Sequence, residues 1–396
     1  MKTKIRRSQL LVIGCFFGFF LFCLVWGLAQ PDRPSSAAEN RSLAQRPAMR
    51  RVVTDFGGFA RDFESYAADQ FPDREQLIGV YTALELAQGK KFARKAYCLQ
   101  GGWLLTKPTP TKPADLSALQ QVLAQAGALD RPLVWCVLPL KNEALYDLEP
   151  AYFSDETGET NKQALTAALT QAEGLTVIDA EAPLVTGTLA DREQYFYKTD
   201  FHWNARGAFA AAQEIARQLA GAGTIAETSV PQAEDFLWSE LGGERRYQGD
   251  LNVWFSNQFS MQEDIPRYVP KNAADLRYFL HPGDIESVPR ETIVGSGLDK
   301  DPLTYNDVFT YNLGYYRVEN PDAPEAASVL ILKDSFQNAT IDYLSAIFRS
   351  VTVVDPRSYQ ETPDLASLLD ADGIDLVLFF YHQNNVSREL IDFLSA

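Results

Sequence analysis

The sequence predicts an α/β fold in which a mostly parallel sheet carries helices on both faces. The C-terminal third alternates short apolar runs with helical segments, as successive βα units do. The runs at 328–332, 351–354 and 376–381 are almost continuously apolar, which is typical of parallel strands buried on both faces. The chain has 396 residues, of which 46% are hydrophobic. This length allows one large α/β domain or two average domains.

An apolar segment at residues 10–30 is predicted to anchor the chain in a lipid bilayer as a single transmembrane helix. About 20 helical residues span about 30 Å, the thickness of a bilayer core. Four basic residues lie within 1–9, and the positive-inside rule places this tail in the cytoplasm and the ectodomain outside the cell membrane. The alternative is a cleaved signal peptide, with Gly27-Leu28-Ala29 as the small-x-small cleavage site. Both interpretations make the body of the protein extracytoplasmic.

Residues 31–50 are rich in Pro, Ser, Ala, Asn and Arg and are predicted to be a linker, and residues 51–396 are predicted to form the ectodomain. Turn residues, aromatics and scattered charge in about 235–315 predict an inserted region of loops and short strands. Asn204 is expected to cap a helix. The predicted helices are 52–98, 116–126, 161–172, 205–219, 336–348, 364–370 and a last one from 387. Additional strands are predicted at 101–105, 133–138 and 175–179.

The charge of the chain argues against nucleic acid as a partner. The formal net charge is −16, whereas nucleic-acid binding depends on Lys and Arg that neutralise phosphates. We interpret the acidic excess as a charge that keeps the protein soluble. No cysteine or histidine spacing typical of zinc occurs, and we expect neither a metal nor a cofactor. We interpret Cys98 and Cys136 as two buried free thiols, with a disulfide as the alternative.

Ser335 is the first candidate catalytic residue. It follows an apolar strand by two residues and starts the predicted helix 336–348. This position exposes the hydroxyl and aims backbone N–H groups at it, so that Phe336 becomes a candidate oxyanion donor. The alternative is that Asp334 or Ser335 only caps the helix.

Asp200 and His202 are the second part of the candidate site. They lie one residue apart before a capped helix, where the carboxylate can hold the imidazole in one tautomer. Because ligands bind at the carboxyl ends of strands in such sheets, we expect Ser335 to meet His202 and complete a Ser-His-Asp triad. The adjacent Trp203 is a candidate substrate-binding residue. The alternative is a surface aspartate and a histidine packed against Trp203.

A polar group follows the last predicted strand. Gln383 and Asn384 lie just beyond His382, and their amides can complete an oxyanion hole. The alternative is an ordinary polar loop. The remaining histidine, His281, precedes a proline in the inserted region and is interpreted as a loop residue.

Two segments resemble a known family. Residues 195–209 read Tyr-Phe-Tyr-Lys-Thr-Asp-Phe-His-Trp-Asn-Ala-Arg-Gly-Ala-Phe and resemble the signature of bacterial DHHW-motif proteins, as does Leu-Ile-Leu-Lys-Asp-Ser-Phe-Gln-Asn at 330–338. The first family histidine is Phe201 here. This family is similar to the SGNH-like proteins of alginate acetylation, the AlgJ and AlgX type. The resemblance implies an SGNH-hydrolase-like three-layer sandwich.

The resemblance also implies roles and partners. Ser335 would be the nucleophile, His202 the base and Asp200 the residue that orients it, and the protein would act with a membrane-bound acyltransferase, an acyl exporter, on a cell-surface polysaccharide. Our first hypothesis is therefore an extracytoplasmic O-acetyltransferase. The alternatives are a carbohydrate esterase or deacetylase with the same triad, and a non-catalytic assembly subunit of a polysaccharide acetylation machine.

Overall fold

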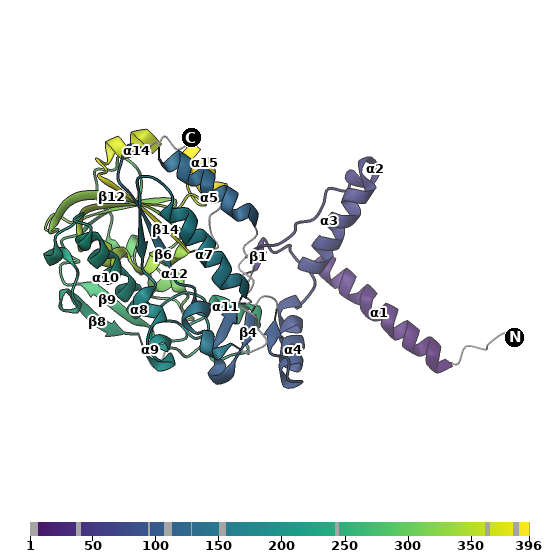
Figure 1. Ribbon diagram of the computed structural model, residues 1–396. Coiled ribbons are helices and arrows are strands. Elements are labelled where there is room, and N and C mark those ends of the chain that lie inside the picture. The colour runs from purple at the N-terminus through teal and green to yellow at the C-terminus, as the bar shows by residue number, and fades with distance from the viewer. Residues whose placement is uncertain are drawn as a thin grey trace. The chain divides into compact units, whose positions relative to one another are not determined.

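The computed structural model describes residues 7–36, 41–93, 96–106, 113–127, 129–149, 156–241, 245–360, 365–382 and 388–395. These residues form two compact units (Figure 1). The first comprises residues 1–93 with 253–258, and the second comprises 94–252 with 259–396. The predicted ectodomain, residues 51–396, therefore includes part of the first unit and all of the second.

The first unit begins with the apolar helix α1 (Arg7–Ala29), in which Ser8–Gly27 is long and apolar enough to cross a membrane. Within residues 31–50, β1 (Ser35–Ser36) pairs antiparallel with β2 (Arg41–Ser42). The Ala44 N–H donates to Asp69 Oδ2 at 2.8 Å, so the described part of the predicted linker is fixed to the end of a helix.

The prediction of a helical segment over 52–98 is wrong in two respects, because the segment is divided into three helices and ends in two strands. The structure has α2 (Arg51–Thr54), α3 (Phe56–Asp69) and α4 (Arg74–Ala87), followed by the strands β3 (Phe92–Ala93) and β4 (Ala96–Cys98). Asp55 caps α3 by accepting the Gly58 N–H. Pro72 cannot donate a helical hydrogen bond. Gly89 has a φ of 89°, a left-handed conformation that ends α4.

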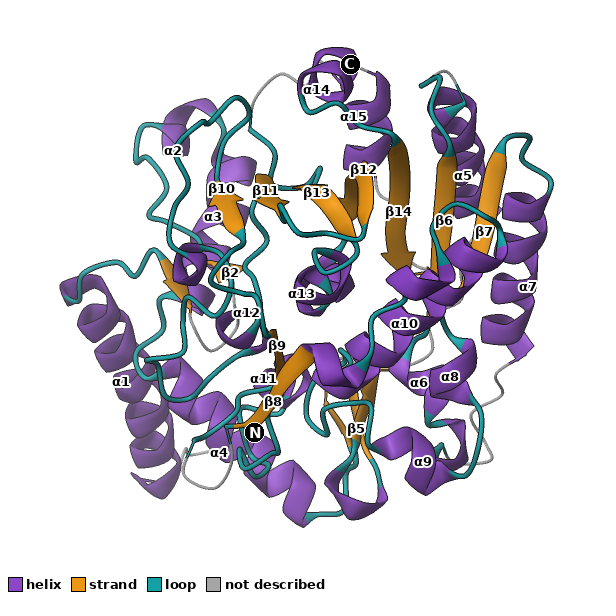
Figure 2. Cartoon of the chain, turned by 90° about the vertical axis from the view of Figure 1, so that its left-hand side faces the viewer, coloured by secondary structure: helices purple, strands orange, loops and turns teal. Residues whose placement is uncertain are grey.

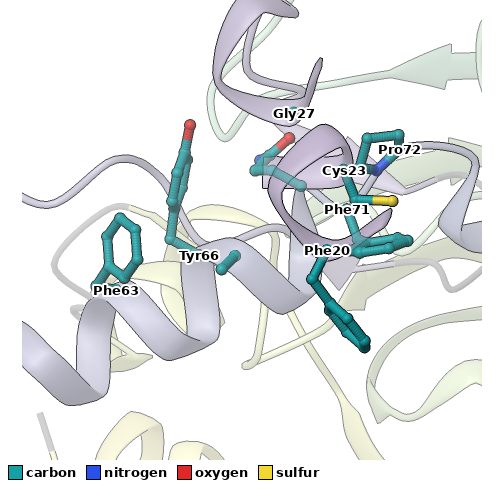
Figure 3. Close-up of a pocket in the computed structure, with 9 residues that line it drawn as sticks. Phe20, Cys23, Gly27, Phe63, Tyr66, Phe71 and Pro72 are labelled. Carbon is teal, nitrogen blue, oxygen red and sulfur yellow. The ribbon is translucent and has the colours of Figure 1, made fainter. Parts of the chain in front are cut away.

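An apolar pocket of about 290 Å³ lies between α1 and α3 in the first unit. Figure 3 shows the side chains of α1 and α3 that gather around it. Its lining is Phe20, Cys23, Gly27, Phe63, Tyr66, Ala67, Gln70, Phe71 and Pro72.

A seven-stranded mixed sheet forms the centre of the second unit, in the order β10-β11-β13-β12-β14-β6-β7 (Figure 2). The five strands from β13 to β7 are parallel, as predicted, whereas β11 is antiparallel to both neighbours. The strands are β6 (Leu133–Leu138), β7 (Leu175–Asp179), β10 (Arg277–Phe279), β11 (Tyr315–Glu319), β12 (Glu325–Lys333), β13 (Phe348–Val354) and β14 (Leu376–His382).

Helices cover both faces of this sheet, which explains why its strands are apolar throughout. In β14, Leu378 and Phe380 face one core and Val377 and Phe379 face the other, because successive side chains of a strand point to opposite faces. The first core contains α8 (Ala182–Val185), α10 (Ala205–Gly221) and α13 (Ile341–Leu344). The second contains α5 (Pro113–Ala126), α7 (Glu156–Thr170), α14 (Leu365–Ala371) and α15 (Arg388–Ser395). The fold is therefore a three-layer α/β sandwich.

The inserted region adds short elements and one edge strand. β8 (Phe236–Glu240) pairs antiparallel with β9 (Pro266–Pro270), and β10 joins the edge of the main sheet. Within this region lie also α11 (Asp250–Trp254), α12 (Tyr305–Val308) and the 3₁₀ turns Ala233–Asp235 and Arg290–Thr292. Short elements outside it are β5 (Leu104–Thr106), α6 (Lys141–Ala144), α9 (Leu189–Glu193) and the 3₁₀ turns Gln100–Gly102, Tyr146–Leu148 and Glu227–Ser229. Cys98 and Cys136 are free thiols.

The predicted helix 336–348 is also wrong. The structure has a 3₁₀ turn at Ser335–Ala339, then the one-turn helix α13, and Phe348 already begins β13. Polar side chains explain the break, because they offer the backbone local hydrogen bonds that compete with a regular helix. Asp334 accepts the Phe336 N–H, and the Thr340 hydroxyl donates to the Gln337 carbonyl at 2.9 Å.

Candidate active site

Ser335 lies at the carboxyl edge of the parallel sheet. β12 ends at Lys333, and Asp334 is held in an extended conformation by its N–H, which donates to the Phe380 carbonyl of β14 at 3.0 Å. Asp334 Oδ1 accepts the Phe336 N–H at 2.9 Å. The nucleophile candidate therefore sits on a tight turn whose start is fixed by the neighbouring strand, and its side chain stays half-buried.

Asp200 and His202 meet Ser335 at this edge, as the sequence predicts. His202 Nε2 is 2.9 Å from Ser335 Oγ, and His202 Nδ1 is 2.7 Å from Asp200 Oδ1. The segment is placed by α10, whose first turn is capped by Asn204 through the N–H groups of Arg206 and Gly207. Three side chains from two distant segments thus form one continuous hydrogen-bonded chain.

The carboxylate of Asp200 is buried and fully hydrogen-bonded. Its Oδ1 also accepts the His202 N–H at 3.0 Å, and its Oδ2 accepts the Tyr247 hydroxyl at 3.2 Å and the Asp250 N–H at 3.0 Å. Burial raises the pKa of Asp200, but the contacts with His202 and the N–H donors outweigh burial and lower this pKa below its usual value. An ionised Asp200 keeps the proton of His202 on Nδ1 and leaves Nε2 free to accept one from Ser335.

Aromatic rings fix the orientation of the His202 imidazole. The Tyr305 ring stacks on it with centroids 3.9 Å apart and an interplanar angle of 4°. Phe201, which replaces the first family histidine, lies on the imidazole with a centroid distance of 3.9 Å. Trp203 is fully buried, and its Nε1–H donates to the Phe336 carbonyl at 3.0 Å. Trp203 therefore holds the nucleophile turn in place and is not positioned to contact a substrate.

Of the predicted oxyanion donors, the Phe336 N–H lies within the described residues. The Phe336 N–H is engaged by Asp334, so in this structure it does not point to an oxyanion. Gln383 and Asn384 lie outside the described residues. Among the described residues, the Ser335 N–H donates to no hydrogen bond, which leaves it available to an oxyanion that forms on a group bound to Oγ.

Lys333 and Asn338 form a buried polar cluster beneath the nucleophile turn. The Lys333 ammonium donates to Asn338 Oδ1 and lies 3.8 Å from Asp355 Oδ2. Burial lowers the pKa of Lys333 to about 8, although the charge of Asp355 opposes this effect. Asn338 Nδ2 donates to Asn312 Oδ1 at 3.1 Å.

Two residues that support the Asp200 segment were missed by the sequence analysis. The ammonium of the buried Lys141 donates to three carbonyls, those of Leu104, Lys198 and Asp200, at 2.7, 3.0 and 2.7 Å. Gly249 packs so closely that a Cβ atom would lie 2.3 Å from the carbonyl carbon of Thr199. No sequence pattern distinguishes Lys141 from a surface lysine, or Gly249 from a glycine in an ordinary loop.

Asp250 lies beside Asp200 and His202, with ligand atoms of all three within 4.8 Å of one another. Three such residues can bind a metal ion in principle. Here both oxygens of Asp200 and both ring nitrogens of His202 already take part in hydrogen bonds. This donor set fits a proton-transfer chain better than a metal site.

The half-buried Asp250 predicts a specific pH dependence of stability. Burial and the charge of Asp200 raise the pKa of Asp250 to about 6, against about 4 in the unfolded chain. Between these values the native state binds more protons, so stability falls as pH rises through this window. Asp250→Asn removes this loss, and we expect its stability advantage over the unsubstituted protein to grow by about 1 kcal/mol from pH 5 to pH 8. Urea unfolding measures it, and a pH-independent advantage would contradict the assignment.

Comparison with known proteins supports the fold. Residues 102–275 match the model of a family described as the SGNH hydrolase-like domain of acetyltransferase AlgX. The chain has an SGNH-like α/β fold. The predicted resemblance to the DHHW and alginate acetylation proteins is confirmed. No curated protein matches the sequence significantly.

Solved structures share this fold at low sequence identity. PatB1 of Bacillus cereus is 23% identical, with 74% of this chain and 97% of PatB1 covered and a TM-score of 0.61. A second structure of PatB1, with a sulfonyl adduct, is 22% identical, with 74% and 95% covered and a TM-score of 0.61. A DHHW family protein of Eubacterium siraeum is 17% identical, with 76% and 94% covered and a TM-score of 0.56.

Proposed function

We propose that this protein is an extracytoplasmic O-acetyltransferase that acylates a cell-surface polysaccharide through Ser335, His202 and Asp200. The observation that carries the proposal is the hydrogen-bonded chain from Ser335 Oγ through His202 to the buried Asp200, with steps of 2.9 and 2.7 Å. A surface aspartate beside a packed histidine would not produce this chain. The match of residues 102–275 to an acetyltransferase family model supports the same reaction class.

The first half of the reaction forms an acyl-enzyme. His202 Nε2 takes the hydroxyl proton while Ser335 Oγ attacks the carbonyl carbon of the acyl donor. The Ser335 N–H is placed to stabilise the negative charge that develops on the carbonyl oxygen. Collapse of the tetrahedral intermediate breaks the bond to the leaving group, and His202 returns the proton to that group.

The second half transfers the acyl group to the polysaccharide. A sugar hydroxyl gives its proton to His202 Nε2 while its oxygen attacks the Ser335 ester. The Ser335 Oγ leaves and takes the proton back, which regenerates the enzyme and leaves an acetylated sugar. If water replaces the sugar, the same steps release acetate, and the protein is then an esterase.

The location proposed for this chemistry defines the donor partner. α1 is long and apolar enough to span a membrane, and the basic residues before it favour a cytoplasmic N-terminus. Acetyl-CoA is cytosolic, so the acetyl group has to be carried across the membrane before it reaches Ser335. We therefore propose a membrane-bound acyltransferase as the partner that supplies it.

The proposal is tested by locating the acyl group. The full-length protein in detergent is exposed to p-nitrophenyl acetate, quenched in acid and digested, and the acetylated peptide is sequenced by mass spectrometry. We expect one acetyl group on Ser335, and pretreatment with a sulfonyl fluoride should block it. Folded protein without acetyl on Ser335 would contradict the proposal and favour the assembly-subunit hypothesis. If the protein releases acetate and added oligosaccharide does not become acetylated, the result would favour the esterase.

A further inference from the structure

A second aspartate–histidine pair lies directly beside the nucleophile. Asp334, fully buried, immediately precedes Ser335, and His382 ends β14 next to β12. Asp334 Oδ2 accepts the His382 N–H at 3.0 Å and lies 2.5 Å from His382 Nδ1. Asp334 Oδ1 is occupied by the Phe336 N–H. The pair therefore ties the end of β14 to the turn that carries Ser335.

The second pair reproduces the geometry of the first. In each pair, one carboxylate oxygen accepts both the backbone N–H and the Nδ1 of the same histidine: Asp200 Oδ1 for His202, and Asp334 Oδ2 for His382. Burial raises the pKa of Asp334, but the contacts with His382 and two N–H donors outweigh it and hold this pKa well below its usual range. An ionised Asp334 accepts the Nδ1–H of His382, and in this tautomer Nε2 is the acceptor of the ring.

The two histidines differ in what their Nε2 atoms contact. His202 Nε2 bonds Ser335 and its side chain is 3% exposed, whereas the His382 side chain is 20% exposed. Among the described residues, no partner lies at His382 Nε2. Both imidazoles pack against the ring of Phe336, with centroid distances of 5.0 and 5.2 Å. The site thus has a second, oriented acceptor nitrogen that the acyl-transfer steps do not use.

We propose that His382 binds the polysaccharide acceptor, its Nε2 accepting a hydrogen bond from the hydroxyl adjacent to the one that is acylated. The inference rests on the proposed function, because it assigns a residue to the second half of that reaction. A vicinal diol of a sugar ring offers two hydroxyls to two histidines that both pack against Phe336, the residue after the nucleophile: one hydroxyl gives its proton to His202, and its neighbour stays protonated and donates to His382. His382 keeps its own proton and forms no covalent bond, so it acts as an acceptor-binding residue and not as a second base.

If His382 binds the acceptor in this way, the protein should transfer acetyl groups to a vicinal diol faster than to a single alcohol. Acetyl transfer from p-nitrophenyl acetate is measured with trans-1,2-cyclohexanediol and with cyclohexanol, two acceptors of the same ring size. Rates are expressed per acetylated Ser335 and per hydroxyl, so partial misfolding cancels in the ratio. The test variant is His382→Asn, whose amide N–H can still donate to Asp334 but which lacks an atom at the Nε2 position. His281→Asn makes the same change at an exposed histidine outside the site.

We expect the unsubstituted protein and His281→Asn to prefer the diol by about fivefold to tenfold, the worth of one neutral hydrogen bond. His382→Asn should reduce the ratio to about one, chiefly through a higher KM for the diol. If the asparagine variant fails to fold, His382→Ser, which also can donate to Asp334, replaces it. A ratio in the variant equal to that of His281→Asn would overturn the role of His382 while leaving the acyl-enzyme intact. Absence of acetyl on Ser335 in the unsubstituted protein would instead overturn the proposed function, and this inference with it.

Discussion

Asp200→Asn is expected to slow the acetylation of Ser335 by about 10⁴-fold while leaving the fold intact. The asparagine side chain has the shape of aspartate, but it presents an N–H where the carboxylate accepts Nδ1–H of His202. His202 then carries its proton on Nε2, 2.9 Å from Ser335 Oγ, and cannot accept another. The hydrogen bonds from the Tyr247 hydroxyl and the Asp250 N–H can persist to the amide oxygen, whereas the one from the His202 N–H is lost. We therefore expect a large loss in rate and a smaller loss in stability.

Burst kinetics with p-nitrophenyl acetate measure the acetylation rate directly. Asp370→Asn is the matched control, because this side chain is 79% exposed and pairs only with Arg131 among the described residues. We expect its acetylation rate to equal that of the unsubstituted protein. An Asp200→Asn variant within tenfold of this control would show that the carboxylate does not orient His202, and that Ser335 is activated in another way.

The parallel sheet and the site at its edge could be predicted because both depend on local patterns. Residues 328–332 and 376–381 are almost continuously apolar, which is typical of strands covered on both faces. The candidate site followed from topology, because strands that run in parallel end at the same edge. Ser335 and His382 follow two such strands and were therefore expected at one edge, and the parallel pairing of β12 with β14 agrees.

The misjudged elements depend on contacts that a linear pattern does not contain. The segment 336–348 has helical periodicity, but Asp334 and Thr340 give its backbone other hydrogen bonds. The antiparallel edge formed by β10 and β11 depends on pairing between residues about 40 positions apart along the chain. The second aspartate–histidine pair was overlooked because Asp334 had an adequate explanation as a helix cap. A cap and a histidine partner are compatible, since the two carboxylate oxygens serve separate donors.

Lys141→Met is expected to destabilise the protein by about 3 kcal/mol or more. The ammonium supplies donors to three backbone carbonyls, and two of these belong to Lys198 and Asp200. Methionine fills the volume of the stem but cannot donate. The Lys198 carbonyl keeps the Leu104 N–H at 3.0 Å, whereas the carbonyls of Leu104 and Asp200 lose a buried donor, which costs about 1–3 kcal/mol for each group that water does not reach. Burial lowers the pKa of Lys141 to about 7, although the charges of Glu263 and Asp200 oppose this effect. Burying the ammonium is therefore unfavourable, and its three hydrogen bonds have to offset this desolvation.

The same substitution at Lys198 separates this effect from the loss of a positive charge. The Lys198 side chain is exposed and lies over the Trp103 ring, 5.7 Å from its centroid, so Lys198→Met should change stability by less than about 1 kcal/mol. Urea unfolding of both variants, followed by near-ultraviolet circular dichroism, gives the comparison. Because Lys141 holds the carbonyl of Asp200, its variant should also acetylate Ser335 more slowly at temperatures where it remains folded. Equal stability of the two variants would mean that water replaces the ammonium, and that the Asp200 segment keeps its place through Gly249 and the N–H groups of α11 alone.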